Sequence, residues 1–398
     1  MIKNLLNKLT EGILMLSSTV TTLTVLLIIV FLFSEGLSVF KESPLEGENI
    51  IVLNHNNSVS HISSSEIKDI FDQKITNWKT IGGANDSIIL FTFNDISNYF
   101  SEEELGPEFE YLPAKMDSLL ESESGMIAVF SSKYLLKNHQ SKIIQADNIT
   151  PYTFIAGKEW FPTANPAVQL GVLPLILGTL YVSFVAILFA LPVGLATAIY
   201  MAEVADEKTR RIFKPVIELL AGIPSVVYGF FGLIVIVPLI QSTFNLPVGE
   251  TGLAGSIILG IMALPTIITV SEDALRNTPR SMKEASLALG ATKWQTIYRI
   301  VIPYSYSGIS AAAILGIGRA IRETMAVLMV TGNAAVMPHT LLEPVRTIPA
   351  TIAAELGEAP ANGIHYKALF ALGCILFLIT LIINLWVEFS SKKRRLGK

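Results

Sequence analysis

The segment Glu284-Ala-Ser-Leu-Ala-Leu-Gly290, followed nine residues later by Ile300-Val-Ile-Pro303, decides the fold of this chain. It lies between two long apolar runs, and its own apolar residues recur at steps of three and four, which predicts a short amphipathic helix. We expect Gly290 to end that helix and Pro303 to lie in the first turn of the next one. Basic residues surround the segment: Arg276, Arg280, Lys283, Lys293 and Arg299. Because basic loops of membrane proteins stay in the cytoplasm, this loop is predicted to be cytoplasmic.

The composition indicates an integral membrane protein. Of the 398 residues, 51% are hydrophobic and only 16% are charged, and several apolar runs are about 20 residues long. The single cysteine, Cys374, lies within the last apolar run, so a disulfide framework and a thiolate metal cluster are excluded. His339 and His365 are far apart in the sequence, and no metal site is predicted from them.

The charges are divided unevenly along the chain. Residues 41–165 carry 9 Lys and Arg against 18 Asp and Glu, a net charge of −9, whereas the remainder carries 20 against 15, a net of +5. The acidic part is therefore predicted to lie outside the membrane and the basic ends inside. Nothing in this pattern favours nucleic-acid binding.

The N-terminal region, residues 1–40, is predicted to be a membrane anchor. Its apolar run, Ile13 to Phe33, continues without a small-residue cleavage site, which favours an uncleaved helix over a cleaved signal peptide, although that alternative stays open. Residues 41–160 are polar and alternate between strand and helix patterns. Ser63 and Glu66 form a capping-box pattern at the start of one such helix. The region is predicted to be an extracytoplasmic α/β insertion.

Five further apolar runs follow in residues 161–391, and a basic tail occupies residues 392–398. The predicted spans are Leu170 to Tyr200, Ile212 to Ile240, Leu253 to Val270, Ile309 to Val330 and Ala368 to Val387. Together with the anchor they predict an all-α integral membrane fold of six transmembrane helices with both termini in the cytoplasm.

Three charged residues interrupt the fifth of these six spans: Arg319, Arg322 and Glu323. Each such charge costs about 2.5–3.5 kcal/mol at a helix centre, so it is retained for function or for pairing. Arg319 and Glu323 are four apart and are expected to share one helix face. Two guanidinium groups suit an oxyanion, and a carboxylate can accept the O–H of hydrogen phosphate, which sulfate lacks. The cluster therefore predicts a transient phosphate site, with a structural ion pair as the alternative.

Several of these segments resemble known families. The 284–303 pattern resembles the coupling loop of ABC-importer permeases, with Ser286 and Ile302 in place of the more usual Ala and Leu. Leu220 to Gly232, Arg319 to Val327 and Gly357 to Ala359 with His365 to Leu372 resemble the PstC family of phosphate ABC-importer permeases. Between its Arg and Glu that family usually carries a small residue, where this chain has Arg322.

This resemblance implies a type I permease core in residues 161–391, with a coupling loop at 276–303. It implies roles in coupling to an ATPase for Glu284, Ala285, Gly290 and Pro303. The substrate path is implied to contain Ser225, Arg319, Arg322, Glu323 and Thr324. The implied partners are a second, PstA-like permease subunit, an ATPase dimer that uses ATP and Mg²⁺, and an extracytoplasmic phosphate-binding protein. The chain has no Gly-x-x-x-x-Gly-Lys-Ser/Thr loop, so it is expected to bind no cofactor and not to be an enzyme.

The insertion resembles part of a periplasmic phosphate-binding protein, at Ile62 to Gly83 and at Gly125 to Tyr134. Such proteins carry an Arg and a Ser-Gly-Thr helix start between these segments, whereas this chain has Phe93 to Phe100 without Arg or Gly. The groups that hold the anion are missing, and a net charge of −9 repels a dianion. We therefore expect a degenerate domain that contacts another protein, with an unrelated α/β insertion as the alternative.

Two other functions remain open at this point. The first is a permease for another oxyanion, sulfate or molybdate, which the carboxylate beside the arginines argues against. The second is a membrane-anchored sensor or scaffold, which would need a cytoplasmic signalling domain, and the tail after Val387 is short. The expected location is the bacterial inner membrane.

Overall fold

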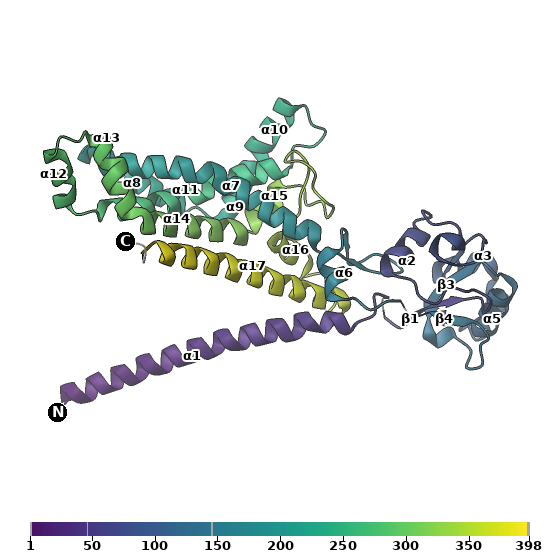
Figure 1. The fold of residues 1–398 in the computed structure, drawn as a ribbon. Coiled ribbons are helices and arrows are strands. Elements are labelled where there is room, and N and C mark those ends of the chain that lie inside the picture. Colours follow the sequence, from purple (N-terminus) through teal and green to yellow (C-terminus); the bar gives the residue numbers. More distant parts are fainter. Residues whose placement is uncertain (1, 46, 145, 396–398) are drawn as a thin grey trace. The chain divides into compact units, whose positions relative to one another are not determined.

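The computed structural model of the chain describes residues 2–45, 47–144 and 146–395. The chain divides into two compact units, residues 1–172 with 360–368, and residues 173–359 with 369–398. The first unit holds the N-terminal helix and the α/β domain, and the second holds the bundle of membrane helices (Figure 1). Part of the expected basic tail, residues 396–398, lies outside the described residues.

Six helices within the described residues are long and apolar enough to cross a membrane. They are Thr10–Lys41, Leu173–Val204, Ser225–Phe244, Gly252–Arg276, Lys293–Arg322 and Ile364–Trp386. The predicted number of spans is therefore confirmed, and the chain is a multi-pass membrane protein.

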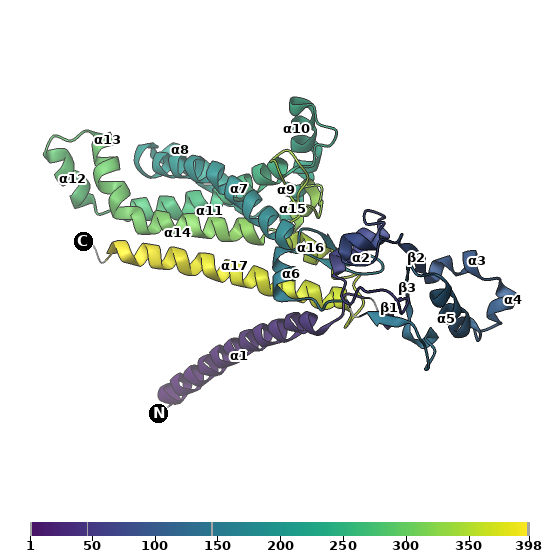
Figure 2. The same cartoon turned by 45° about the vertical axis from the view of Figure 1, so that its right-hand side comes forward.

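In the first unit, α1 (Ile2–Ser38) precedes a four-stranded sheet with the order β2-β3-β1-β4. The strands are β1 (Asn49–Leu53), β2 (Ile89–Thr92), β3 (Met126–Ser131) and β4 (Lys142–Ile144). Strands β2 and β3 are parallel, whereas β1 is antiparallel to both of its neighbours. Alternate residues of β1 belong to two hydrophobic cores, one on each face of the sheet. Ile51 and Leu53 pack with α2 (Ser64–Phe71), and Val52 packs with α5 (Leu112–Ser122). The sheet is thus covered on both faces, as Figure 2 shows for α5.

The two ends of the insertion, residues 44–45 and 167–168, pair with each other, and we call these two segments the paired base. Leu45 bridges to Ala167, and the Val168 N–H donates to the Pro44 carbonyl at 2.9 Å. Next to this base, β5 (Trp160–Phe161) pairs with β6 (Gln169–Leu170), and α6 (Pro151–Ala156) covers them. The remaining short helices of the domain are α3 (Ile96–Tyr99) and α4 (Glu102–Leu105).

In the second unit, α11 (Gly252–Arg276) packs along both α7 (Leu173–Ile199) and α14 (Ile302–Arg322). A Cβ atom at Gly308 of α14 would lie 2.3 Å from the Ala274 Cβ, so glycine permits this close approach. The other helices are α8 (Glu207–Ala221), α9 (Ser225–Phe231), α10 (Val237–Phe244), α12 (Arg280–Ala288), α13 (Lys293–Thr296), α15 (Met325–Val330), α16 (Ile348–Glu355) and α17 (Ile364–Arg395). In both views α12 and α13 lie beyond the ends of α11 and α14 (Figures 1 and 2).

Two predicted spans are broken in the structure. The run from Ile212 to Ile240 was expected to be one helix, but α8 ends at Ala221 and α9 begins at Ser225, because Pro224 cannot donate to the preceding turn. The run from Ile309 to Val330 is interrupted after Arg322, where Glu323 takes an extended conformation with φ −70° and ψ 131°. The six spans are present as predicted, and the structure adds these two breaks to them.

Candidate functional site

The break in the fifth span exposes backbone groups beside three charged side chains. The Glu323 carboxylate accepts the Ala326 N–H at 3.4 Å, and the Thr324 hydroxyl donates to the Arg322 carbonyl at 3.3 Å. Interrupted helices inside transporters commonly build substrate sites, because their free backbone groups need a polar surrounding. The expectation that Arg319 and Glu323 share one helix face was wrong, since α14 ends between them.

Arg319 faces the centre of the membrane unit. Its guanidinium group lies 3.5 Å from the hydroxyl oxygen of Thr266 on α11, a long hydrogen bond. Tyr228 of α9 packs on the same helix α11, against Ile258 and Met262, and its hydroxyl donates to the Leu220 carbonyl at 2.8 Å. Ser225, the first residue of α9, is half-buried one turn before Tyr228. Arg319 is thus placed among polar groups of α9 and α11.

Arg322 has different neighbours. It is exposed, and its Nε donates to the Gly318 carbonyl at 2.8 Å. With Thr324 it lines a cleft. The other walls of this cleft are Pro349, Ile352 and Ala353 of α16, Leu356 and Gly357 just after α16, and Leu376 of α17. The two arginines therefore lie against different helices. Throughout the described ranges, neither of them forms an ion pair with Glu323 within 4.0 Å, so the structural ion pair considered above is not formed.

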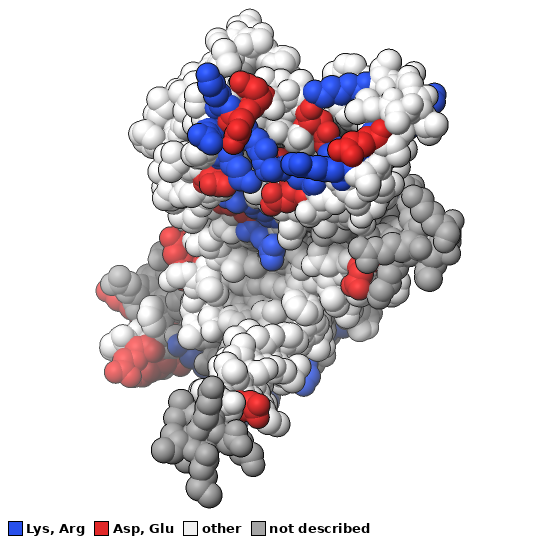
Figure 3. Space-filling view, turned by 90° about the vertical axis from the view of Figure 1, so that its left-hand side faces the viewer, with Lys and Arg blue, Asp and Glu red and all other residues white. Residues whose placement is uncertain are grey.

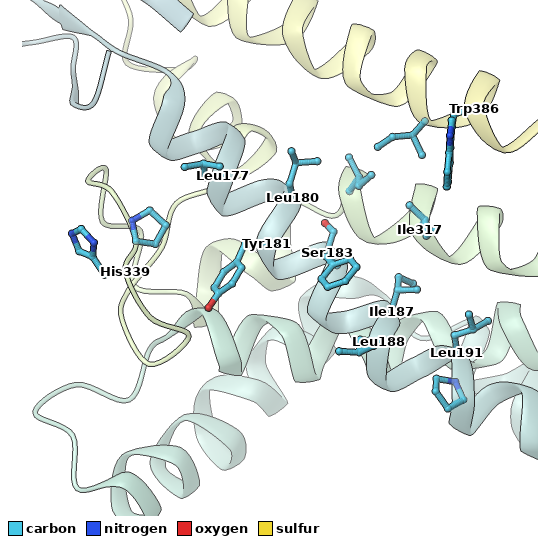
Figure 4. Close-up of a pocket in the computed structure, with 15 residues that line it drawn as sticks. Leu177, Leu180, Tyr181, Ser183, Ile187, Leu188, Leu191, Ile317, His339 and Trp386 are labelled. Atoms are coloured by element: carbon cyan, nitrogen blue, oxygen red, sulfur yellow. The ribbon is translucent and has the colours of Figure 1, made fainter. Parts of the chain in front are cut away.

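A second, apolar groove of about 800 Å³ lies between α7, α14 and α17 (Figure 4). Tyr181, Ser183 and His339 supply the polar atoms of its wall, and the rest is aliphatic or aromatic. None of its described lining residues is Lys or Arg, and none of the three charged residues of the break lines it. This groove does not suit an oxyanion.

The coupling segment forms the helix predicted for it. After α12, the Gly290 N–H donates to the Leu287 carbonyl and the Ala291 N–H to the Ser286 carbonyl, at 2.9 and 3.2 Å. This is the Schellman ending, and Gly290 has a φ of +82°, a conformation that glycine adopts without strain. Pro303 lies in the first turn of α14 as expected.

Most of α12 faces outward. Glu284 and Ala285 are exposed, and the following Leu289 is 91% exposed. The departure from the usual Ala at Ser286 adds a hydrogen bond, because its hydroxyl lies 3.0 Å from that of Thr296. This bond holds α12 to α13 while the outer face of α12 stays free for another protein.

In the insertion, the Asp95 carboxylate caps the turn Phe93–Asp95 that follows β2. Asp95 accepts the Thr92 N–H at 3.0 Å and the Thr92 hydroxyl at 2.7 Å. The Thr92 N–H and hydroxyl are therefore both used within the chain. Three aromatic rings pack beside this turn, with Phe93 against both Phe109 and Tyr134.

Three residues of this region were not selected from the sequence: Thr266, Tyr228 and Glu272. Glu272 is 2% exposed near the C-terminal end of α11, with three basic side chains within 4.0 Å. Its position at the end of an apolar run is typical of an ordinary polar helix end. Only the packing of α8 against α11 shows that it is buried.

Comparisons with known proteins agree on the membrane unit. The family model described as "Binding-protein-dependent transport system inner membrane component" matches residues 190–396, and a model for a PBP superfamily domain matches residues 47–186. The chain is 37% identical over 260 residues to the probable ABC transporter permease protein YqgH of Bacillus subtilis, covering 65% of this chain and 83% of that protein. It is 37% identical over 258 residues to the phosphate transport system permease protein PstC of Mesorhizobium japonicum, covering 60% and 78%. A solved structure of the MetNI methionine ABC transporter, 19% identical, covers 55% of this chain and 94% of its own with a TM-score of 0.44.

Proposed function

Because this chain belongs to the family of binding-protein-dependent transport system inner membrane components, we propose that it is the permease subunit of an ATP-driven phosphate importer. It forms half of the translocation path, and a second, PstA-like permease subunit forms the other half. An extracytoplasmic phosphate-binding protein delivers the substrate. The complex lies in the bacterial inner membrane, with both termini of this chain in the cytoplasm.

The observation that carries this proposal is the unpaired carboxylate at the break in the fifth span. Glu323 lies next to Arg322 in the chain, and Arg319 is three residues before Arg322. With its carboxylate outside any ion pair among the described residues, Glu323 is available to accept the O–H of hydrogen phosphate. Arg319 supplies the opposite charge, and Arg322, Thr324 and Ser225 contribute further polar contacts along the path.

This chemistry separates phosphate from the other oxyanions. Sulfate and molybdate carry no proton at neutral pH, so an ionised carboxylate beside them is repulsive. A sensor or scaffold would not need a charged break inside a membrane span, which costs free energy on insertion.

The test is ATP-dependent uptake of radiolabelled phosphate by the complete complex in proteoliposomes. Excess sulfate or molybdate is expected to leave the uptake unchanged, and Glu323→Gln is expected to slow phosphate uptake while the complex still assembles. Transport of sulfate by the wild-type complex would reassign the substrate, and normal phosphate uptake by the Glu323 variant would remove this residue from the mechanism.

Energy reaches this chain through α12. The chain lacks a phosphate-binding Gly-Lys-Ser/Thr loop, so a partner ATPase dimer binds ATP and Mg²⁺ and the chain itself is not an enzyme. Glu284, Ala285 and the outward-facing Leu289 offer the ATPase a mixed polar and apolar surface. Gly290 and Pro303 fix where α12 ends and α14 begins.

Gly290→Val is expected to weaken ATPase binding and phosphate uptake by about tenfold. A branched residue in the left-handed conformation costs roughly 1–2 kcal/mol, so the end of α12 would rearrange. Gly290→Asn is the matched control, because Asn tolerates this conformation and a Cβ atom at position 290 has open space around it. Equal ATPase affinity of the Val and Asn variants, measured by surface plasmon resonance, would contradict the role assigned to this glycine.

The insertion contacts another protein in this proposal and does not bind phosphate. The segment Phe93 to Phe100 supports this, because it carries neither Arg nor Gly and its turn is closed by hydrogen bonds from Thr92 to the negatively charged Asp95. In the same uptake assay, deletion of residues 46–158 is expected to leave substantial uptake, since the pairing of Pro44 and Leu45 with Ala167 and Val168 lies outside the deletion. Complete loss of uptake with normal assembly would place the insertion in phosphate delivery.

A further inference from the structure

A buried carboxylate joins α8 to the cytoplasmic end of α11. Oε1 of Glu272 lies 3.2 Å from Nε of Arg210 and 3.7 Å from Nη1 of Arg276, and Oε2 lies 3.8 Å from Nζ of Lys214. Arg210 and Lys214 are both on α8, and Glu272 itself is almost fully buried. Figure 3 shows acidic and basic side chains gathered at the end of the membrane unit where these helices meet. The three basic partners offset the cost of burying the carboxylate, so this cluster fixes α8 on α11.

A second buried ion pair joins the coupling helix to α7. Lys283 of α12 donates to Glu203, which lies in the π-helical turn Tyr200–Val204 at the end of α7. Both side chains are largely buried. The Ser305 hydroxyl donates to the Ala274 carbonyl at 2.8 Å and lies 3.1 Å from the Thr278 hydroxyl, which fixes the connection between α11 and α12 to α14.

These contacts close a ring of four helix ends. Ala205 and Asp206 alone separate the π-helical turn Tyr200–Val204 from α8, and Asp206 caps α8 by accepting the Thr209 N–H at 3.2 Å. Hydrogen bonds from Thr209 lower the pKa of Asp206 below its usual value, so the cap stays ionised. Residues 277–279 alone separate α11 from α12. The two ion-pair clusters and the two short connections therefore hold α7, α8, α11 and α12 together.

The other end of α8 reaches the charged break. The Tyr228 hydroxyl of α9 donates to the carbonyl of Leu220, in the last turn of α8. Tyr228 is buried and packs with Ala326 of α15, whose N–H donates to the Glu323 carboxylate at 3.4 Å. The first half of α8 thus belongs to the ring of helix ends, and its last turn contacts Tyr228, which packs beside the charged break.

We propose that α8 carries the movement of the coupling helix to the Arg319 region, and that Glu272 is the positioning residue that makes α8 move with α11 and α12. The inference rests on the proposed transport function and adds the route by which ATP-driven motion reaches the substrate site. Glu272 touches neither phosphate nor the ATPase in this proposal. It acts through Arg210 and Lys214.

Glu272→Gln is expected to lower the phosphate transported per ATP hydrolysed by about tenfold in the reconstituted complex, a coupling effect of ordinary size. Uptake and ATP hydrolysis are measured in parallel on the same proteoliposomes. Asp273→Asn is the matched control. Asp273 also pairs with Lys214, at 3.7 Å, but its side chain is 59% exposed and water screens the pair, so the phosphate transported per ATP hydrolysed is expected to stay at the wild-type value. Tyr228→Phe removes only the hydroxyl at the far end of α8 and is expected to lower the ratio as well, which provides a second test if the Glu272 variant does not assemble.

A distance measurement separates this role from simple stabilisation. Spin labels at Lys208→Cys on α8 and Ser281→Cys on α12, in a Cys374→Ala background, are expected to give one narrow distance with and without trapped ATP. Glu272→Gln is expected to broaden the distribution of distances between the two labels. An unchanged transport ratio or an unchanged narrow distance in the Glu272 variant overturns the inference. Absence of phosphate uptake by the wild-type complex would instead overturn the proposed function.

Discussion

Phosphate uptake is expected to fall by about 100-fold when Arg319 is replaced by Gln. A charge-assisted hydrogen bond to the anion contributes about 3 kcal/mol, and each 1.4 kcal/mol corresponds to a factor of ten. Arg319 is half-buried between α9 and α11, so no other guanidinium group within the described residues takes its place beside Thr266. The measurement is the initial rate of ATP-dependent uptake in proteoliposomes, normalised to the amount of assembled complex.

Arg322→Gln is the comparison that tests the geometry. Arg322 is exposed against α16 and α17 and already donates to the Gly318 carbonyl, so its replacement is expected to lower uptake much less than that of Arg319. Arg319→Lys keeps the charge but loses the planar fork, and an intermediate rate is expected. Equal losses in the two Gln variants would show that the arginines act as one site despite their different neighbours.

Gly178→Val is expected to destabilise the membrane unit by about 3 kcal/mol. A Cβ atom at this position would lie 2.2 Å from the Arg346 carbonyl oxygen, which is backbone and has no rotamer with which to move away. The loop beyond it is fixed by the Ile348 N–H, which donates to the Thr179 hydroxyl at 2.9 Å, and by the 2.8 Å ion pair between Arg346 and Glu355. The melting temperature of the purified protein in detergent is expected to fall by roughly 10 °C.

Gly357→Val provides the control for this prediction. Gly357 lies in the same outer region, but a Cβ atom there would meet nothing within 4 Å. The melting temperature of the Gly357→Val variant is expected to stay close to the wild-type value. If both variants melted at the same temperature, the close approach of α7 to the Arg346 backbone would not be a constraint on the fold.

The membrane architecture could be predicted because it depends on length and polarity alone. A span is a run of apolar residues long enough to cross the bilayer, and six such runs are visible without any knowledge of packing. The ends of two helices could also be predicted from short local sequence patterns. Ser63 and Glu66 form the reciprocal hydrogen bonds of a capping box, and Gly290 takes the left-handed conformation that ends α12.

The breaks in the third and fifth spans could not be found in the same way, because hydropathy measures composition and not backbone continuity. Arg319 and Glu323 have the spacing of neighbours on one helix, and that spacing is equally compatible with a helix that stops between them. In the third span, Lys214 and Glu218 were a usable signal, since both precede Pro224 and belong to α8 rather than to the membrane helix.

The burial of Glu272 depends on contacts between segments that are distant in the sequence. About 60 residues separate it from Arg210 and Lys214, and no local pattern reports on such a distance. The same holds for the different surroundings of Arg319 and Arg322, which are set by α9, α11 and α16 rather than by the three-residue interval between them.

The paired base of the insertion makes this domain an exchangeable module. Its entry and exit strands lie side by side at Leu45 and Ala167, so a different compact domain with adjacent ends can be grafted there without altering the connection to either helix. A fluorescent protein or an antibody epitope at this point would report on the outer side of the membrane. Related permeases could likewise gain or lose such a domain in a single genetic event, while the helices on which transport depends keep their sequence.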